Sequence, residues 1–249
     1  MIYKLENPSR AAELFGNWEE TILWSCLQGI MGRIYVDDVD NPAAAKAVLG
    51  DFAFLAGMPN EELVQHDIWQ GLILVPQNDA WAQCIERILG AAARPALRYA
   101  ILKEENIFDK EKLQQLAAAL PQGYQLKSID ASLYRQCLQE EWSVDLVKQF
   151  ETYEKFERYA LGIVALKEQE IAAGASTYSA YDKGIEIEVD TKEEHRRKGL
   201  ATACAAKLIL QCLKKGLYPS WDAANLWSVA LAEKLGYHRG EAYMVYEVA

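Results

Sequence analysis

The sequence has little of the two residue types that hold disulfide-bonded and metal-stabilised folds together. It contains five cysteines and three histidines, and no Cys-x-x-Cys pair occurs. An odd number of scattered cysteines gives no disulfide framework, and three separated histidines give no metal-ligand cluster. We therefore expect reduced, mostly buried thiols and no metal.

Long apolar runs are also missing. No run approaches the roughly 20 residues that cross a bilayer. The first residues, Met1–Glu6, lack the basic region and the apolar region of a secretory signal. These observations predict a cytoplasmic protein with no membrane partner.

Basic residues are outnumbered, 26 to 36, which gives a net charge of −10. Residues 1–125 carry 10 basic and 17 acidic groups, and residues 126–249 carry 16 and 19. A nucleic-acid binder needs a broad basic face, so this balance argues against that class. It is compatible with a small cationic ligand.

What is present describes a globular α/β protein. Apolar residues make up 51% and charged residues 25% of the chain, and 249 residues fit one large domain or two small ones. Pro121-Gln122-Gly123 interrupts the periodic pattern. We place a domain boundary there, with a smaller α/β domain in residues 1–123 and a second domain in residues 124–249.

Hydrophobic periodicity and turn residues predict nine elements in the first domain. The helices are expected at Pro8–Phe15, Trp18–Gln28, Glu61–Trp69, Asp79–Leu89 and Lys110–Leu120, and the strands at Arg33–Val39, Asp51–Ala56, Leu72–Val75 and Ala96–Leu102. Asn17 and Glu20 resemble a capping box for the second helix. The segment after Asn41-Pro42 stays open, because it suits either a helix start or a loop.

The second domain has a clearer pattern. Strands are expected at Tyr124–Ile129, Leu161–Leu166, Ile171–Ser179, Ile185–Thr191, Leu217–Trp221 and Tyr237–Val248, and helices after Asp130 or Ser132 and at Val144–Tyr159, Leu200–Lys215 and Asn225–Leu235. Asp222 is a capping candidate for the last helix. The order β-α-α-β-β-β-α-β-α-β predicts a mixed sheet flanked by helices, of the α/β (α+β) class.

One segment carries the clearest chemistry. The strand Ile185–Thr191 runs into a basic loop with Gly199, and this loop opens a helix of small residues. A helix N-terminus offers unpaired backbone N–H groups and a positive dipole end, and glycine allows a ligand to approach the backbone. Arg196, Arg197 and Lys198 add positive charge. The segment therefore predicts an anion site.

Two motifs resemble those of the GNAT superfamily of N-acetyltransferases. Arg196-x-x-Gly199-x-Ala201 matches the family's Q/R-x-x-G-x-G/A loop, which holds the pyrophosphate of acetyl-coenzyme A (acetyl-CoA). The run from Asn225 to Tyr237 resembles the family's N-x-x-A/S-x-x-L-x-E-K-L-G-F helix. The second half is thus similar to a GNAT domain, and the whole chain resembles the subgroup typified by the zwittermicin A resistance protein.

The resemblance implies a splayed sheet with acetyl-CoA as the acyl-donor co-substrate, held between strands 185–191 and 217–221. The cofactor-binding residues it implies are Val189, Thr191, Arg196, Arg197, Lys198, Gly199, Leu200, Ala201, Thr202, Asn225 and Ser228. Unpaired strand backbone would bind the pantetheine arm. The expected reaction is direct attack of a primary amine, from a small-molecule acceptor, on the thioester. A homodimer is left open.

The catalytic residues are less well defined. Glu186 and Glu188 share one face of their strand and are candidate bases, although two solvated residues on a half-exposed strand would show the same pattern. The family's general-acid tyrosine aligns with Ala232. Ser228, Tyr237 or water would have to replace it, or the thiolate leaves unprotonated. The alternative function is a non-catalytic acyl-CoA-binding or sensory module.

Residues 33–102 show an element order similar to the middle of the second half. Pro76–Trp81 follows a strand but has no glycine and no basic residue. The first domain is therefore either a degenerate GNAT-like module without a pyrophosphate loop or an unrelated α/β domain. Its acidic surplus suggests a cationic acceptor such as a polyamine or an aminated antibiotic.

The remaining side chains have ordinary interpretations. Cys204 and Cys212 are expected to be buried thiols, and His195 to be a surface residue next to phosphate. Trp221 and Trp227 are expected in the core rather than in an acceptor cleft.

Overall fold

The computed structural model describes all residues from 1 to 249, and its mixed α/β architecture confirms the predicted class. The chain forms two compact units. Unit 1 comprises Met1–Arg98 and Ala242–Ala249, and unit 2 comprises Tyr99–Glu241. The division differs from the boundary expected at residue 123, because helix α5 (Lys110–Ala118) packs on helix α8 (Leu200–Lys214) of unit 2.

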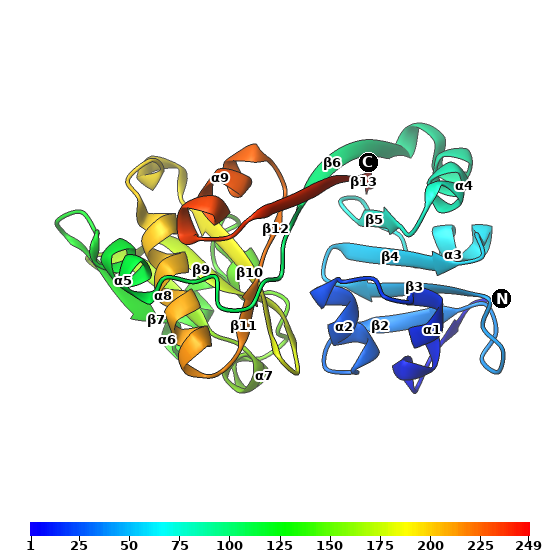
Figure 1. The fold of residues 1–249 in the computed structure, drawn as a ribbon, viewed down its shortest axis with the longest axis horizontal. Coiled ribbons are helices and arrows are strands. Elements are labelled where there is room, and N and C mark those ends of the chain that lie inside the picture. Colours follow the sequence, from blue (N-terminus) through cyan, green and yellow to red (C-terminus); the bar gives the residue numbers. More distant parts are fainter. The chain divides into compact units, whose positions relative to one another are not determined.

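Unit 1 is built on a mixed sheet (Figure 1). Its strands, in spatial order, are β1 (Tyr3–Lys4), β2 (Arg33–Val36), β3 (Ala44–Leu49), β4 (Phe52–Gly57), β5 (Ile73–Pro76) and the end of β13 (Arg239–Val248). All described neighbours are antiparallel except β4 and β5. Its helical segments are η1 (Pro8–Ala11), α1 (Ala12–Phe15), α2 (Thr21–Leu27), α3 (Glu61–Gln65), α4 (Asp79–Leu89) and η2 (Gly90–Ala92).

Two expectations for unit 1 need correction. The segment left open after Pro42 forms strand β3, whose six residues are all buried. Helix α2 begins at Thr21 rather than at Trp18, with Glu20 at the N-cap and no side-chain cap. The Asn17–Glu20 pattern is therefore no capping box. By contrast, α4 has the predicted bounds, and its N-cap Asn78 accepts a hydrogen bond from the Trp81 N–H.

Unit 2 contains a five-stranded sheet in the order β11-β10-β9-β8-β7. The strands are β7 (Tyr124–Ser128), β8 (Gly162–Lys167), β9 (Glu170–Tyr181), β10 (Gly184–Thr191) and β11 (Tyr218–Ser220). Only β10 and β11 run parallel. Besides α5 and α8, the unit contains α6 (Ala131–Cys137), η3 (Val144–Leu146), α7 (Tyr153–Tyr159), η4 (Glu193–His195), β12 (Asp222–Ala223) and α9 (Leu226–Leu235). β6 (Ala93–Ile101) and β13 carry the chain between the units.

The single helix expected at Val144–Tyr159 is wrong. The segment forms the short η3 and then α7, which starts anew because the Thr152 side chain accepts from the Lys155 N–H. Between them, the Tyr134 hydroxyl donates to the Phe150 carbonyl at 2.5 Å. Leu146 of η3 fills the space beside Gly174, so η3 covers one face of the β9–β10 region.

None of the helices has both the length and the apolar composition that a membrane crossing requires.

Candidate functional site

The sheet of unit 2 opens between β10 and β11. The two strands pair only at Gly184–Glu186 and Tyr218–Ser220, whereas β10 stays paired with β9 as far as Thr191. After Ser220 the chain leaves to form β12, which pairs with β6 instead. From Ile187 onward, β10 is therefore paired with β9 on one edge and no longer with β11 on the other, and we call this gap in the strand pairing the opening.

Two backbone donors point into this opening. The Lys192 N–H donates to the Ala172 carbonyl of the β9 side at 3.0 Å. Donors alternate between the two edges of an antiparallel strand, so the N–H groups of Val189 and Thr191 face the other way. Both residues are half-buried.

A basic turn follows β10 and leads into α8. Arg197 and Gly199 both adopt left-handed backbone conformations, with φ of +62° and +81°. Gly199 is the N-cap of α8, makes no side-chain cap and has open space beside it, and no acidic residue lies in the first turn. The N-terminus of α8 therefore presents unpaired backbone N–H groups and the positive end of the helix dipole.

The residues of this turn differ in what they expose. Arg196, Arg197, Lys198 and Gly199 are exposed, Ala201 is half-buried, and Leu200 and Thr202 are buried. The last two therefore offer a ligand chiefly their backbone.

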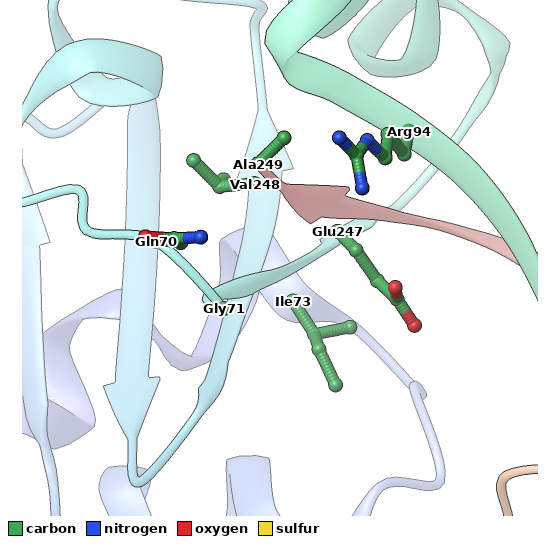
Figure 2. A pocket seen from close by; sticks show the side chains of 7 residues that line it. All are labelled: Gln70, Gly71, Ile73, Arg94, Glu247, Val248 and Ala249. Carbon is green, nitrogen blue, oxygen red and sulfur yellow. The ribbon is translucent and has the colours of Figure 1, made fainter.

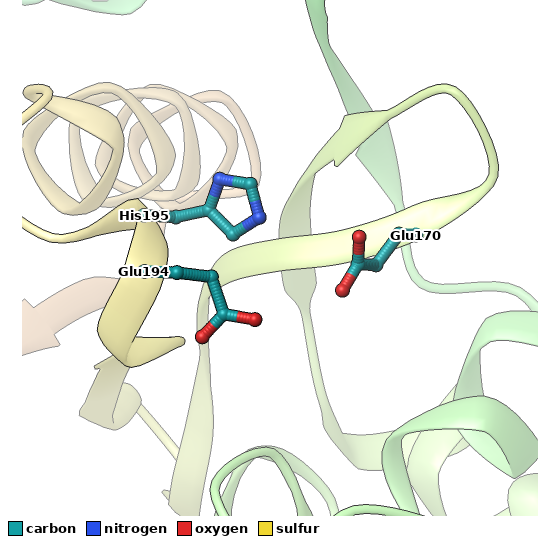
Figure 3. A group of neighbouring side chains, drawn as sticks. All are labelled: Glu170, Glu194 and His195. Atoms are coloured by element: carbon teal, nitrogen blue, oxygen red, sulfur yellow. The ribbon is translucent and has the colours of Figure 1, made fainter.

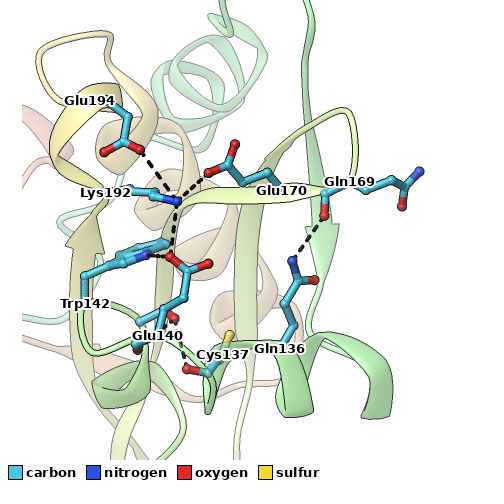
Figure 4. Close-up of polar contacts among 9 residues, drawn as sticks. Gln136, Cys137, Glu140, Trp142, Gln169, Glu170, Lys192 and Glu194 are labelled. Carbon is cyan, nitrogen blue, oxygen red and sulfur yellow. Dashed lines mark hydrogen bonds and ion pairs between the residues drawn. The ribbon is translucent and has the colours of Figure 1, made fainter.

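Lys192 fastens the turn to the rest of the unit (Figure 4). Its ammonium group lies 2.5 Å from Glu170, 3.2 Å from Glu140 and 3.6 Å from Glu194. The hydrogen bonds to Glu170 and Glu140 raise its pKa, so it is charged at neutral pH. Lys192 thus connects three segments: the start of β9 through Glu170, the segment after α6 through Glu140, and η4 through Glu194. We call these three ion pairs the clamp.

His195 holds the turn against β7 by a hydrogen bond. It is only 6% exposed, and its Nδ1 lies 2.7 Å from the Tyr124 hydroxyl of β7. The expectation of a surface histidine beside phosphate is therefore wrong. Figure 3 shows that His195 also neighbours Glu170 and Glu194, and potential ligand atoms of the three lie within 4.8 Å of one another. The Lys192 ammonium already supplies a cation to both glutamates.

Glu186 lies at the base of the opening, as the last β10 residue paired with β11. It is 5% exposed, and its neighbours in register are Ser179 and Ser220, both buried. Burial raises the pKa of the Tyr181 and Tyr218 hydroxyls, and the charge of Glu186 adds to both shifts. A carboxylate thus lies among hydroxyl groups at the point where the strands separate.

Glu188 and Asp190 continue the same face of β10, as the strand period requires. Asp190 is in register with Gly174, beside η3. Burial raises the pKa of Asp190, and the nearby Asp145 of η3 contributes to the rise.

Asn225 and Ser228 lie at the start of α9. Asn225, not Asp222, is the N-cap, and its Oδ1 accepts from the Ser228 N–H at 3.0 Å. The Ser228 Oγ accepts from the Trp221 Nε1 at 3.0 Å, which leaves its own O–H available to donate.

Trp221 is buried as expected, but Trp227 is 87% exposed, so the core assignment is wrong for Trp227. Tyr237 is buried and donates its hydroxyl to the Pro219 carbonyl at 2.6 Å. Burial raises its pKa well above the usual value, so it is a poor proton donor. Ala232 is fully buried.

Cys204 and Cys212 are buried, and burial raises the pKa of both thiols, that of Cys212 to about 12. This confirms the expectation of buried thiols, and a raised thiol pKa makes both side chains poor nucleophiles.

A separate hollow lies in unit 1 (Figure 2). It is lined by Gln70, Gly71, Ile73, Arg94, Glu247, Val248 and Ala249. One cation, one anion and a few apolar groups favour no particular ligand.

The family model for GNAT acetyltransferases matches residues 12–246. The chain belongs to the GNAT acetyltransferase family. A GCN5-related N-acetyltransferase-like protein from Streptococcus suis 89/1591 is 50% identical, with a TM-score of 0.94 over 98% of this chain and 99% of that one. The uncharacterized N-acetyltransferase YdfB of Bacillus subtilis (strain 168) is 26% identical over 91% of this chain and 89% of its own length.

A more distant GNAT structure shows the fold alone. It is a tandem GNAT protein from the clavulanic acid biosynthesis pathway, 12% identical, with a TM-score of 0.55 over 100% of this chain and 99% of that one.

Within this GNAT chain, the sequence located the turn and the two acidic candidates but missed their supports. Lys192, Tyr124, Ser179 and Ser220 gave no local signal, because their partners lie far away in sequence.

Proposed function

We propose that this protein transfers an acetyl group from acetyl-CoA to a primary amine of a small acceptor. One observation carries the proposal: the open edge of β10 leads directly into a basic turn at the N-terminus of the 15-residue helix α8. Acetyl-CoA has the matching shape, an amide-containing arm followed by a pyrophosphate. Edge donors suit the arm, and a helix N-terminus suits the anion.

Different residues would bind different parts of acetyl-CoA. Val189 and Thr191 would donate backbone N–H groups to the pantetheine arm. The pyrophosphate would lie on the backbone of the Gly199–Thr202 turn, with Arg196, Arg197 and Lys198 around it. Asn225 and Ser228 would flank the reacting end.

Glu186 is the proposed base. The acceptor nitrogen must be neutral to attack the thioester carbonyl, and a buried carboxylate among hydroxyls is suited to take up its proton. As the new C–N bond forms and the C–S bond breaks, the electron pair goes to sulfur, and the Ser228 O–H, which is not used in the contact with Trp221, would donate a hydrogen bond to the thiolate.

The acceptor is proposed to be cationic. Asp190 lies beside η3, and Glu186 and Glu188 precede it at alternate positions of β10. A polyamine or an aminated antibiotic would place one neutral amine at the thioester and keep its other ammonium groups near these carboxylates.

Unit 1 is proposed to be a degenerate copy of the same module. In both units, three antiparallel strands are followed by a helix and by a strand parallel to the third. β4 then corresponds to β10, so the counterpart of the pyrophosphate turn is Met58–Asn60 rather than Pro76–Trp81. It has no basic residue and leads into a five-residue helix. The similarity of the whole chain to a tandem GNAT protein supports duplication.

The cofactor site is tested by Gly199→Glu with Gly216→Glu as its matched control. Both glycines have positive φ and open surroundings, but Gly199 begins α8 and Gly216 follows its end. Calorimetric titration with acetyl-CoA should show one site per chain in the wild type, because unit 1 lacks the turn. Gly199→Glu should abolish binding and Gly216→Glu should retain it.

A thiol-release assay over a panel of cationic and neutral amines then tests catalysis. Release with a cationic amine, lost in Gly199→Glu, supports the enzyme. Absence of acetyl-CoA binding by the wild type would refute the proposal. Binding without release for any amine would favour the non-catalytic acyl-CoA-binding module, which the buried Ala232 at the acid position also favours.

A further inference from the structure

The two backbone donors that face the opening are already hydrogen-bonded. The Val189 N–H donates to Glu188 Oε1 at 3.1 Å, and the Thr191 N–H donates to Asp190 Oδ1 at 2.6 Å. In each case the acceptor is the carboxylate of the preceding residue, which reaches over the strand edge. The alternation of acid and donor along Glu188–Thr191 therefore caps the open edge from within the strand.

The physical reason is the cost of an unpaired donor. A half-buried backbone N–H without an acceptor is unfavourable, and β11 has left this part of the sheet. A charged acceptor makes a stronger hydrogen bond than a neutral amide carbonyl. A ligand arm that needs these donors must therefore displace a better acceptor than its own.

We infer that Glu188 and Asp190 are internal caps of the cofactor groove, and that the pantetheine arm must displace both carboxylates to bind. The two side chains thus lower the affinity for the arm without affecting the nucleotide end of the cofactor. This inference rests on the proposed function, because it requires that the groove bind coenzyme A.

The test compares two ligands. Coenzyme A carries the arm, and adenosine 3′,5′-bisphosphate carries the nucleotide end without it. Glu188→Ala and Asp190→Ala each remove one cap, and each should tighten coenzyme A binding about 5-fold in calorimetric titrations. Binding of the bisphosphate should stay unchanged.

Asp145→Ala is the matched control. It removes one carboxylate near Asp190 that caps no β10 donor, since its oxygen pairs with Lys148. It should change neither affinity. Thermal unfolding of every variant shows that the comparison is made on folded protein, and two independent caps guard against one variant that fails to fold.

Three results would overturn the inference. Equal tightening of both ligands would show a general charge effect, for example through Arg196, which lies near Asp190. If Asp145→Ala tightened coenzyme A binding as much as the two cap variants do, this too would show a general charge effect. Unchanged or weaker coenzyme A binding by both folded cap variants would show that the carboxylates do not compete. If the wild type bound neither ligand, the proposed function itself would fail.

Discussion

At the scale of single residues, the acidic side chains of β10 differ in what surrounds them. Glu186 lies among buried hydroxyl-bearing residues where β10 and β11 part, whereas Glu188 is tied to the strand edge by its bond to the Val189 N–H. Of the two, only Glu186 is buried, and it is the last β10 residue that pairs with β11. The two candidate bases that the sequence could not separate therefore have different environments.

We expect Glu186→Gln to lower kcat about 100-fold, because a general base typically contributes 10²- to 10⁴-fold. Acetyl-CoA affinity should be unchanged, since no cofactor donor is removed. Steady-state thiol release and calorimetry measure the two quantities. Glu157→Gln, an exposed change on α7, is the control. Full kcat in Glu186→Gln would exclude Glu186 as the base.

The structural role of a residue could be predicted where it depends on its neighbours in the sequence. A glycine that opens a helix is recognisable from its neighbours, and Gly199 is the N-cap of α8. The burial of His195 was not predictable, because its partner Tyr124 lies 71 positions earlier. The exposure of Trp227 was missed for a related reason: burial depends on which helix face meets the sheet, and α9 has only a weak apolar stripe.

At the scale of elements, the basic turn before α8 consists of the short 3₁₀ helix η4 and four exposed residues, and contacts at its start hold it in place. Lys192 supplies most of these, through three carboxylates from three segments. Lys198 adds a bond to the Glu194 carbonyl at 2.7 Å. Its geometry therefore depends on residues outside the family motif.

We expect Lys192→Met to increase amide hydrogen exchange in residues 192–199 and to weaken acetyl-CoA binding, because a looser turn must be ordered on binding. Lys192→Arg should preserve most of both properties. Lys155→Met, a change on α7, breaks an exposed ion pair with Glu151 and serves as the control. If exchange in the turn is the same in Lys192→Met and the wild type, the clamp has no role in ordering it.

The bounds of helices and strands could be predicted where a polar face and an apolar face are clearly separated in the sequence pattern. The amphipathic α4 has its predicted bounds. Strand β3 was missed because both faces are buried and its sequence, with three alanines and Lys46, resembles neither a strand nor a helix. The helix expected at residues 144–159 is broken by tertiary contacts of Tyr134 and Phe150, which periodicity does not reveal.

At the scale of the whole molecule, the chain crosses between its units twice. The last residues return to unit 1, where Tyr246 and Glu247 pair with β5. Val245, Tyr246 and Val248 are buried there. A boundary search along the sequence assumes that each unit is one continuous segment, so it had no means of assigning this strand.

We expect deletion of residues 242–249 to unfold unit 1. Losing three buried apolar side chains removes about 5 kcal/mol of burial free energy, which is comparable to the stability of a whole domain. Urea unfolding followed by circular dichroism measures the loss. The milder double change Val245→Ala and Val248→Ala should give an intermediate midpoint. An unchanged midpoint in the deletion would show that β13 is dispensable.

The returning strand also sets an order of events during synthesis. A ribosome delivers residues 1–98 first, then all of unit 2, and only then the strand that completes the first sheet. At roughly 5–20 residues per second, that interval is on the order of ten seconds. Throughout it, the β5 edge of the nascent sheet lacks its neighbour, and exposed strand edges promote association between chains. The growing polypeptide therefore needs protection by chaperones until residues 242–249 have been translated.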